Sequence, residues 1–307
     1  MKTGLLIISH GSRDSSWTAL VDEAIAQAEW PADVLVASSF LECVPGRDIQ
    51  DGIDALEAQG AERIAVIPLF VSEGSTHVDE IGWALGAKQE LLAETDLEPF
   101  RVQAELIYGS PLGEHEALYA MLAHQLQELQ MNGTRDAVML IAHGSPHQPF
   151  QTRWRESLHR MAERLTALGM CARASHSLLC CDDIAAHTLQ LAQEMQASSS
   201  SFAYQQEPER NIHNEAEADS SGAIARQNDG GLSSHAQGRV AVIPLFLSRG
   251  YFTTHVIPSR LKELLRSDEE EMTSRAKVVY AGTPLLPHPA LTSWLEQEAA
   301  RLLSSWT

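Results

Sequence analysis

The feature that most constrains the fold of this chain is an internal repeat. The segment RIAVIPLFVSEG at residues 63–74 returns as RVAVIPLFLSRG at residues 239–250, with nine of the twelve positions identical. Two further pairs follow the same order: LLIISHGS (5–12) with VMLIAHGS (138–145), and GSPLGEHEAL (109–118) with GTPLLPHPAL (282–291). Self-similarity over so long a period indicates two copies of one structural unit. We therefore expect two domains that share a fold.

Within each copy, short apolar runs alternate with longer segments of helical period. The expected strands are residues 5–8, 34–39, 64–70 and 102–108 in the first copy, and 137–142, 172–178, 240–247 and 278–281 in the second. In the first copy the expected helices are residues 17–28, 49–59, 78–93 and 115–129. Such alternation indicates βαβ units and a parallel sheet. The predicted fold class is therefore α/β, with a four-stranded parallel sheet and helices on both faces in each copy.

The turn residues MNGT separate the two copies. We predict an N-terminal domain at residues 1–131 and a C-terminal domain at residues 135–307. The second copy also contains a segment at residues 197–237 that is rich in Ser, Gln, Asn, Glu and Gly, where the first copy has only a short link. Few apolar side chains are available there to offset the entropy of ordering the chain. We therefore predict a disordered surface insertion.

Charge and composition narrow the range of partners. The formal net charge of −19 argues against a nucleic acid or an anionic membrane, because both favour basic surfaces. No apolar run reaches the length of a membrane span, and the first apolar run is too short for a signal peptide. The four cysteines lack the C-x-x-C spacing, which supports neither a zinc knuckle nor a secreted disulfide framework. We expect a cytoplasmic protein.

Three residues with ligand chemistry follow predicted strands of the first copy. His10 follows the first strand, Glu42 the second and His77 the third. Because ligands of an open parallel sheet bind at the carboxyl ends of its strands, these side chains are expected to meet. Neutral imidazole is a good ligand for Co²⁺, Ni²⁺ and Fe²⁺, and two histidines with one carboxylate leave coordination positions open. The pattern favours a site that binds a divalent metal transiently and has proton acceptors at hand.

The motifs SHGSR at residues 9–13, VIPLFVSEGSTHVDEI at 66–81 and GSPLGEHEAL resemble those of the sirohydrochlorin chelatase family, the class II tetrapyrrole chelatases. The resemblance implies a monomer in which two flavodoxin-like domains face a cleft. It implies a lyase that inserts Co²⁺ or Fe²⁺, or alternatively Ni²⁺, into sirohydrochlorin during cobalamin or sirohaem biosynthesis. The metal would be a substrate, with no permanently bound cofactor.

The resemblance also assigns roles to individual residues. His10 and His77 match the metal-binding pair of the family and Glu42 matches its acidic partner, so these three are the predicted catalytic residues. The carboxylates of such a substrate are not favoured by the net charge of −19 and need local donors, for which Ser12, Arg13 and backbone N–H groups of the loops are the candidates, with Arg249 across the cleft.

The second copy departs from this pattern. His143 and His255 occupy the places that correspond to the histidine pair, but Cys180 stands where Glu42 would align. His255 also lies five residues after its glycine, whereas His77 lies three residues after Gly74. We therefore predict that the second site is degenerate and that the first copy is catalytic.

Two other functions fit parts of the pattern. A non-catalytic metal or tetrapyrrole carrier could use the same ligands. A histidine-phosphatase-like enzyme is suggested by SHGSR, but Ser9 precedes His10 where that class has arginine, and no second arginine-rich phosphate pocket is evident.

Overall fold

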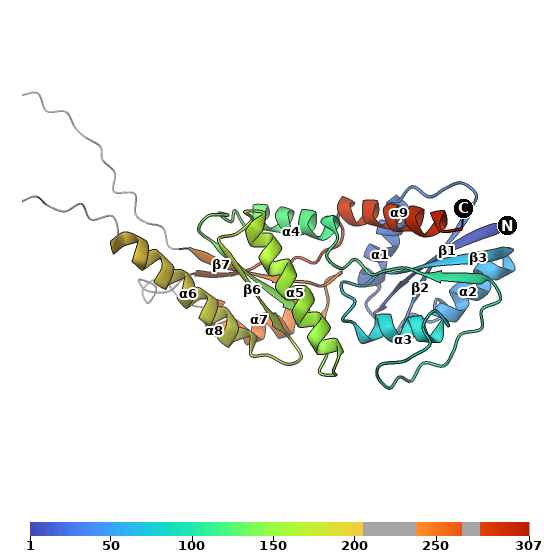
Figure 1. The fold of residues 1–307 in the computed structure, drawn as a ribbon, viewed down its shortest axis with the longest axis horizontal. Coiled ribbons are helices and arrows are strands. Elements are labelled where there is room, and N and C mark those ends of the chain that lie inside the picture. Colours follow the sequence, from blue (N-terminus) through green and yellow to red (C-terminus); the bar gives the residue numbers. More distant parts are fainter. Residues whose placement is uncertain (205–237, 266–276, 307) are drawn as a thin grey trace, which may run out of the picture.

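The computed structural model describes residues 1–204, 238–265 and 277–306 (Figure 1). The first half forms a sheet of order β2-β1-β3-β4 and the second a sheet of order β6-β5-β7-β8. Every pairing of neighbouring strands is parallel. The strands are β1 (Lys2–Ser9), β2 (Val34–Phe40), β3 (Ala61–Pro68), β4 (Glu105–Tyr108), β5 (Ala137–Ala142), β6 (Arg173–Leu178), β7 (Arg239–Pro244) and β8 (Lys277–Tyr280). The predicted fold class, two α/β units with four-stranded parallel sheets, is confirmed.

Helices cover both faces of each sheet, as expected. They are α1 (Ser15–Gln27), α2 (Ile49–Ala58), α3 (Thr76–Ala84), α4 (Glu116–Glu128), α5 (Phe150–Ala167), α6 (Ile184–Tyr204), the short π-helix η1 (Phe252–Val256), α7 (Ile257–Arg260), α8 (Lys262–Leu265) and α9 (Pro289–Ser304). None of the helices in the described ranges is both long and apolar enough to cross a membrane.

Beyond small shifts at the ends of most elements, two predicted segments differ clearly from the structure. The helix predicted at residues 78–93 ends at Ala84, because the buried carboxylate of Asp79 accepts a hydrogen bond from Leu92 N–H at 3.0 Å and pairs with Lys88. These contacts fold the chain back after the helix. Helix α6 continues to Tyr204, so the first eight residues of the predicted insertion are helical and that part of the prediction is wrong. Residues 205–237 of the insertion lie outside the described residues.

The central strands are buried on both faces, which explains why their apolar runs are continuous rather than alternating. In β1, Leu6 and Ile8 contact the cluster beneath α2 and α3, while Leu5 and Ile7 face the opposite side. That opposite cluster also contains core residues of β5, so one apolar core runs through both halves.

The last helix of each half packs on the other half. Helix α9 contacts α1 and β3 of the first half, and Figure 1 shows α4 beside α5 of the second half. A hydrogen bond fixes each of these helices on the other half. Glu298 on α9 accepts a hydrogen bond from Ser110 N–H at 2.9 Å. Gln125 on α4 donates a hydrogen bond to Thr283 O at 3.1 Å. The helices α4 and α9 therefore join the two halves of the chain.

Glu298→Ala is expected to lower the free energy of unfolding by about 1–3 kcal/mol, because Ser110 N–H would lose the buried carboxylate that accepts its hydrogen bond. Chemical denaturation monitored by fluorescence would measure the change. Gln297→Ala, an exposed position on the same helix, is the matched control and should change stability by less than about 0.5 kcal/mol. Equal effects from the two substitutions would contradict the role assigned to the exchanged helix.

Candidate functional site

A cleft of about 550 Å³ lies between the two halves. Residues that follow β1, β3, β5 and β7 line it, as expected for the carboxyl ends of parallel strands. Among the residues that the structure describes, no Lys, Arg, Asp or Glu lines the cleft. Its walls combine apolar side chains, hydroxyl groups and histidines: Trp17, Leu69, Phe70, Val71, Trp154, Leu245, Phe246, Leu247, Tyr251 and Phe252, with Ser12, Ser75, Thr76, Ser145, Ser248, His10, His77, His143 and His147.

His10 and His77 meet at one wall of this cleft. His10 directly follows β1, and His77 lies in the first turn of α3. Their ring centroids are 4.8 Å apart and the rings are edge to face, with an interplanar angle of 83°. The structure therefore brings together the two residues that the sequence predicts as metal ligands.

An oxygen acceptor faces the Nδ1 atom of each of these rings. His77 Nδ1 is 2.5 Å from Glu80 Oε1. His10 Nδ1 is 3.2 Å from Gly11 O and 3.6 Å from Glu42 Oε1. A histidine whose Nδ1–H is engaged in this way keeps the Nε2 lone pair for a metal, and the carboxylate orients the ring. His77 thus has a hydrogen-bonded carboxylate behind it, whereas His10 is held by a backbone carbonyl oxygen and has the Glu42 carboxylate nearby.

The site favours a neutral His10 and an ionised Glu80. Burial lowers the pKa of His10 below its ordinary value, and the neighbouring His77 lowers it further, with a smaller contribution from His143 across the cleft. Burial acts to raise the pKa of Glu80, but hydrogen bonds from His77 and Thr95 outweigh it, so the net shift is downward. At neutral pH His10 is therefore available as a ligand, and Glu80 is an acceptor for His77.

A glycine sets the position of the loop that carries His10. Gly11 has φ of +94°, and a Cβ atom at this position would lie 2.0 Å from the carbonyl oxygen of Glu42. The backbone of Glu42 also donates a hydrogen bond to His10 O at 3.1 Å. The loops after β1 and β2 can approach this closely only with glycine there.

The other predicted site residues differ in their placement. Ser12 lines the cleft, whereas Arg13 is exposed and lies outside the lining. Glu42 is close to His10, but its side chain is 57% exposed and does not line the cleft. Arg249 does not line the cleft either.

Glu80 is the residue of this site that was not among the predicted site residues. The available signal was its spacing from His77, because residues i and i+3 of a helix lie on the same face. The acidic pair Asp79–Glu80 was visible in the sequence, but its two members have different roles. Asp79 is buried against Lys88, and Glu80 contacts the histidine.

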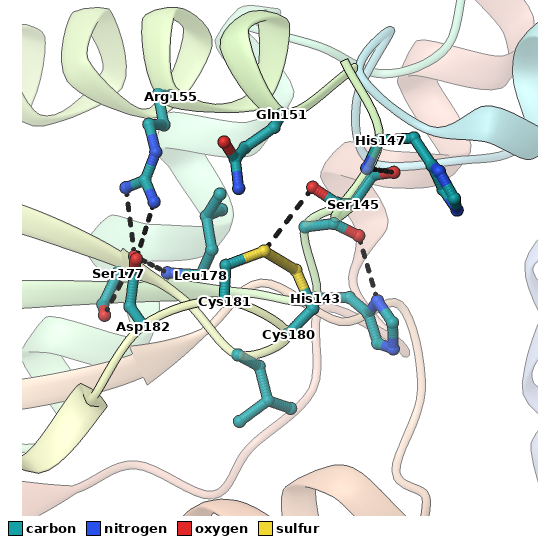
Figure 2. Close-up of a disulfide and its surroundings, with 12 residues drawn as sticks. His143, Ser145, His147, Gln151, Arg155, Ser177, Leu178, Cys180, Cys181 and Asp182 are labelled. Carbon is teal, nitrogen blue, oxygen red and sulfur yellow. Dashed lines mark hydrogen bonds and ion pairs between the residues drawn. A yellow bond between two sulfur atoms is a disulfide. The ribbon is translucent and has the colours of Figure 1, made fainter. Parts of the chain in front are cut away.

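In the second half, Cys180 occupies the place of Glu42. Cys180 N–H donates to His143 O at 3.0 Å, the same contact that Glu42 makes with His10. Cys180 and Cys181 form a disulfide beside the loop that carries His143 and Ser145 (Figure 2). The C-x-x-C spacing and a secreted disulfide framework were considered from the sequence, and a disulfide between adjacent cysteines was not predicted.

The predicted correspondence between His255 and His77 is wrong, because Phe252 occupies that place. Tyr108 at the end of β4 donates a hydrogen bond to Val78 O at 3.0 Å, and Tyr280 at the end of β8 donates to Thr253 O at 2.7 Å. Thr253 therefore corresponds to Val78, and the residue before it is Phe252.

The ring contacts lead to the same assignment. The His143 and Phe252 rings lie 4.9 Å apart at 82°, almost the geometry of His10 and His77. His255 instead stacks on Tyr251 at 5.4 Å. Phe252 lies two residues after Gly250, whereas His77 lies three residues after Gly74, so the loop of the second half is one residue shorter. The spacing of the histidines alone did not reveal this difference.

Within the described ranges, no group of three or more His, Cys, Asp or Glu side chains is arranged to hold a metal ion. The site therefore offers two imidazole nitrogens rather than a closed protein shell. Such an open set leaves positions for water or for donor atoms of a second substrate.

Glu80→Gln is expected to weaken Co²⁺ binding by about 10- to 100-fold, because the carboxylate orients His77 and strengthens its donation. Titration with Co²⁺ alone, followed by its visible absorption, measures the affinity. Glu73→Gln makes the same chemical change at an exposed position of the preceding loop and should leave the affinity unchanged. An unaltered affinity in Glu80→Gln would show that the carboxylate does not support a metal ligand.

Comparison with known proteins defines the class first. The fold is similar to that of SirB from Bacillus subtilis with Fe³⁺, with a TM-score of 0.60, 17% sequence identity, and coverage of 98% of this chain and 96% of that chain. At that identity the likeness shows the fold alone: two α/β units, each with a parallel sheet.

Sequence comparison then gives the family. The CbiX family model matches residues 4–129 and 212–302, so the chain belongs to the CbiX family of sirohydrochlorin chelatases. It is 27% identical over 144 residues to a sirohydrochlorin cobaltochelatase from Priestia megaterium, covering 46% of this chain and 44% of the relative. It is also 27% identical over 143 residues to a sirohydrochlorin ferrochelatase from the same organism, covering 46% and 50%. The matches thus span about half the length of these relatives.

Proposed function

We propose that this protein is a sirohydrochlorin chelatase that inserts a divalent metal, Co²⁺ or Fe²⁺, into the tetrapyrrole as a lyase of cobalamin or sirohaem biosynthesis. The observation that carries the proposal is the His10–His77 pair, whose rings meet 4.8 Å apart at the wall of an apolar cleft. Membership of the CbiX family and the named activities of the two relatives support it.

In this proposal the metal ion is a substrate, held by Nε2 of His10 and of His77. Two nitrogen ligands bind a first-row divalent ion without enclosing it, so the ion can be passed on. The neutral state of His10 favours loading at neutral pH. Apolar walls exclude water from the transfer and strengthen the electrostatic interactions within the cleft.

Insertion releases two protons, because the macrocycle exchanges two pyrrole N–H protons for M²⁺. The site has two histidine–carboxylate pairs, His10 with Glu42 and His77 with Glu80. When a histidine releases the metal, its Nε2 can accept a pyrrole proton, and the nearby carboxylate stabilises the imidazolium that forms. Glu42 is largely exposed, which gives one pair a direct route to solvent.

The carboxylates of sirohydrochlorin require hydrogen-bond donors or cationic side chains. Among the described residues, no Lys or Arg lines the cleft. We propose that they lie at the rim of the cleft, where Ser12 and the exposed Arg13 are near, with Arg249 on the side of the second half. The apolar centre would then hold the macrocycle itself.

Anaerobic incubation with sirohydrochlorin and Co²⁺, Fe²⁺ or Ni²⁺, followed by absorption spectra, tests the function. A metal-dependent spectral change with repeated turnover is expected. A metal or tetrapyrrole carrier with the same ligands would bind one equivalent without turnover, so substoichiometric enzyme distinguishes the two. The domain limits at residues 131 and 135, a monomeric state and a cytoplasmic location also remain proposals.

A further inference from the structure

The second half has lost the donors of a metal site while keeping its backbone. Phe252 stands in the place of His77. Cys180, which forms a disulfide with Cys181 (Figure 2), stands in the place of Glu42. A disulfide sulfur is not a thiolate and does not serve as a metal ligand in its place. Of the three positions, only His143 keeps its donor.

Aromatic side chains gather where the donors were lost. Tyr251 is 69% exposed and Phe252 39% exposed, and both line the cleft. Phe246 stacks near Phe252, with 6.1 Å between ring centroids, and Tyr251 lies 6.2 Å from Phe252. By the correspondence of Phe252 with His77, Tyr251 stands where the first half has Thr76.

The loop after β3 in the first half is packed against a helix, whereas the corresponding loop after β7 in the second half is not. A Cβ atom at Gly74 would lie 2.8 Å from the indole of Trp154, so this loop packs directly on α5 of the second half. A Cβ atom at Gly250 would have no heavy atom within 4 Å. The loop that carries Tyr251 and Phe252 is thus left open beside the cleft. Large aromatic surface exposed in a cleft is typical of a binding surface rather than of a folding core.

From this arrangement we infer that Tyr251 and Phe252 form an aromatic platform that binds the flat conjugated face of a tetrapyrrole macrocycle, opposite the metal-binding pair His10 and His77. The inference rests on the proposed function and goes beyond it, because it gives the second half a role in binding the macrocycle. The two rings are inclined at 63° to each other, so one can stack on the flat π-system in an offset contact while the other meets it edge to face. The metal and the macrocycle would thus be held by different halves of one duplicated fold.

The test uses the full chain and metal-free sirohydrochlorin, kept anaerobic, with binding followed by quenching of tryptophan fluorescence. Trp17 and Trp154 line the cleft and are placed to report it. Tyr251→Ala and Phe252→Ala should each raise the Kd for sirohydrochlorin by about three- to tenfold, and Phe252→Tyr should restore it. Leu168→Ala, at an exposed apolar position outside the cleft, is the control.

The affinity for Co²⁺ alone should be the same in all variants, because the platform does not touch the metal pair. If the wild type binds sirohydrochlorin and both alanine variants bind it with the same Kd, the platform is overturned and the proposed function still stands. A parallel loss of Co²⁺ affinity would also overturn it, because the substitutions would then act through the fold. Failure of the wild type to bind sirohydrochlorin would overturn both proposals.

Discussion

His10→Ala or His77→Ala is expected to reduce the rate of metal insertion by more than about 100-fold. Substitutions of residues that only orient a metal ligand cost about 10- to 100-fold, and each of these substitutions removes one of two ligands. Each also removes one of the two histidine–carboxylate pairs that are available to take up protons. Initial rates with sirohydrochlorin at saturating Co²⁺ measure the effect. Thermal melts should change little, since both residues lie at the ends of elements rather than in the core.

His143→Ala is the matched comparison, because His143 occupies the place of His10 in the second half. Its ring faces Phe252 rather than a second histidine, so its loss should reduce the rate by less than about tenfold. Equal losses from the two halves would indicate one composite site that spans the cleft. A larger loss from His143→Ala would place the metal site in the second half.

Asp136→Ala is expected to lower the free energy of unfolding by about 3–5 kcal/mol, the usual cost of removing one partner of a buried ion pair. Asp136 is fully buried and accepts hydrogen bonds from Arg239 N–H at 2.9 Å and from Asn132 N–H at 2.9 Å. Its carboxylate also pairs with the Arg239 guanidinium, which itself donates to Leu129 O at 3.1 Å. This group ties the segment between the halves to β7. Urea denaturation measures the loss, and one below about 1 kcal/mol would contradict this role.

The same carboxylate should contribute to acid sensitivity. Burial acts to raise the pKa of Asp136, but hydrogen bonds from Asn132 and Arg239 outweigh it and hold the pKa below its ordinary value of 3.8. Because the pKa is lower in the folded state, the stabilisation is complete above that ordinary value and declines as pH falls through the folded-state pKa. Asp136→Asn should therefore flatten the dependence of unfolding free energy on pH below 3.8. If the unfolding free energy of Asp136→Asn falls with pH as steeply as that of the wild type below 3.8, Asp136 is not the source of the acid sensitivity.

Local pattern predicted most of the fold. Continuous apolar runs identified the strands buried on both faces, and their alternation with helical segments predicted two parallel sheets. The juxtaposition of His10 and His77 was also predictable, because the segments that lead from parallel strands into the next helices lie at the same edge of the sheet. These inferences need only the order of elements along the chain.

Contacts between distant segments decided the rest. The exchange of α4 and α9 depends on which surfaces pack best in three dimensions, and no local pattern encodes that choice. Glu80 and Asp79 are neighbours in sequence, yet the helix turns one toward His77 and the other toward Lys88.

The correspondence of Phe252 with His77 illustrates the same limit. In the sequence His255 is the nearest histidine after the repeated strand, and a loop one residue shorter is invisible to a search for like residues. The hydrogen bonds of Tyr108 and Tyr280 define the register that places Phe252 in the cleft. The repeat by itself therefore determined two copies of one fold, and the strand order placed His10 and His77 at one sheet edge of the first copy. Tertiary packing alone decided what faces that pair, because a side chain's position across a cleft depends on register and loop length together.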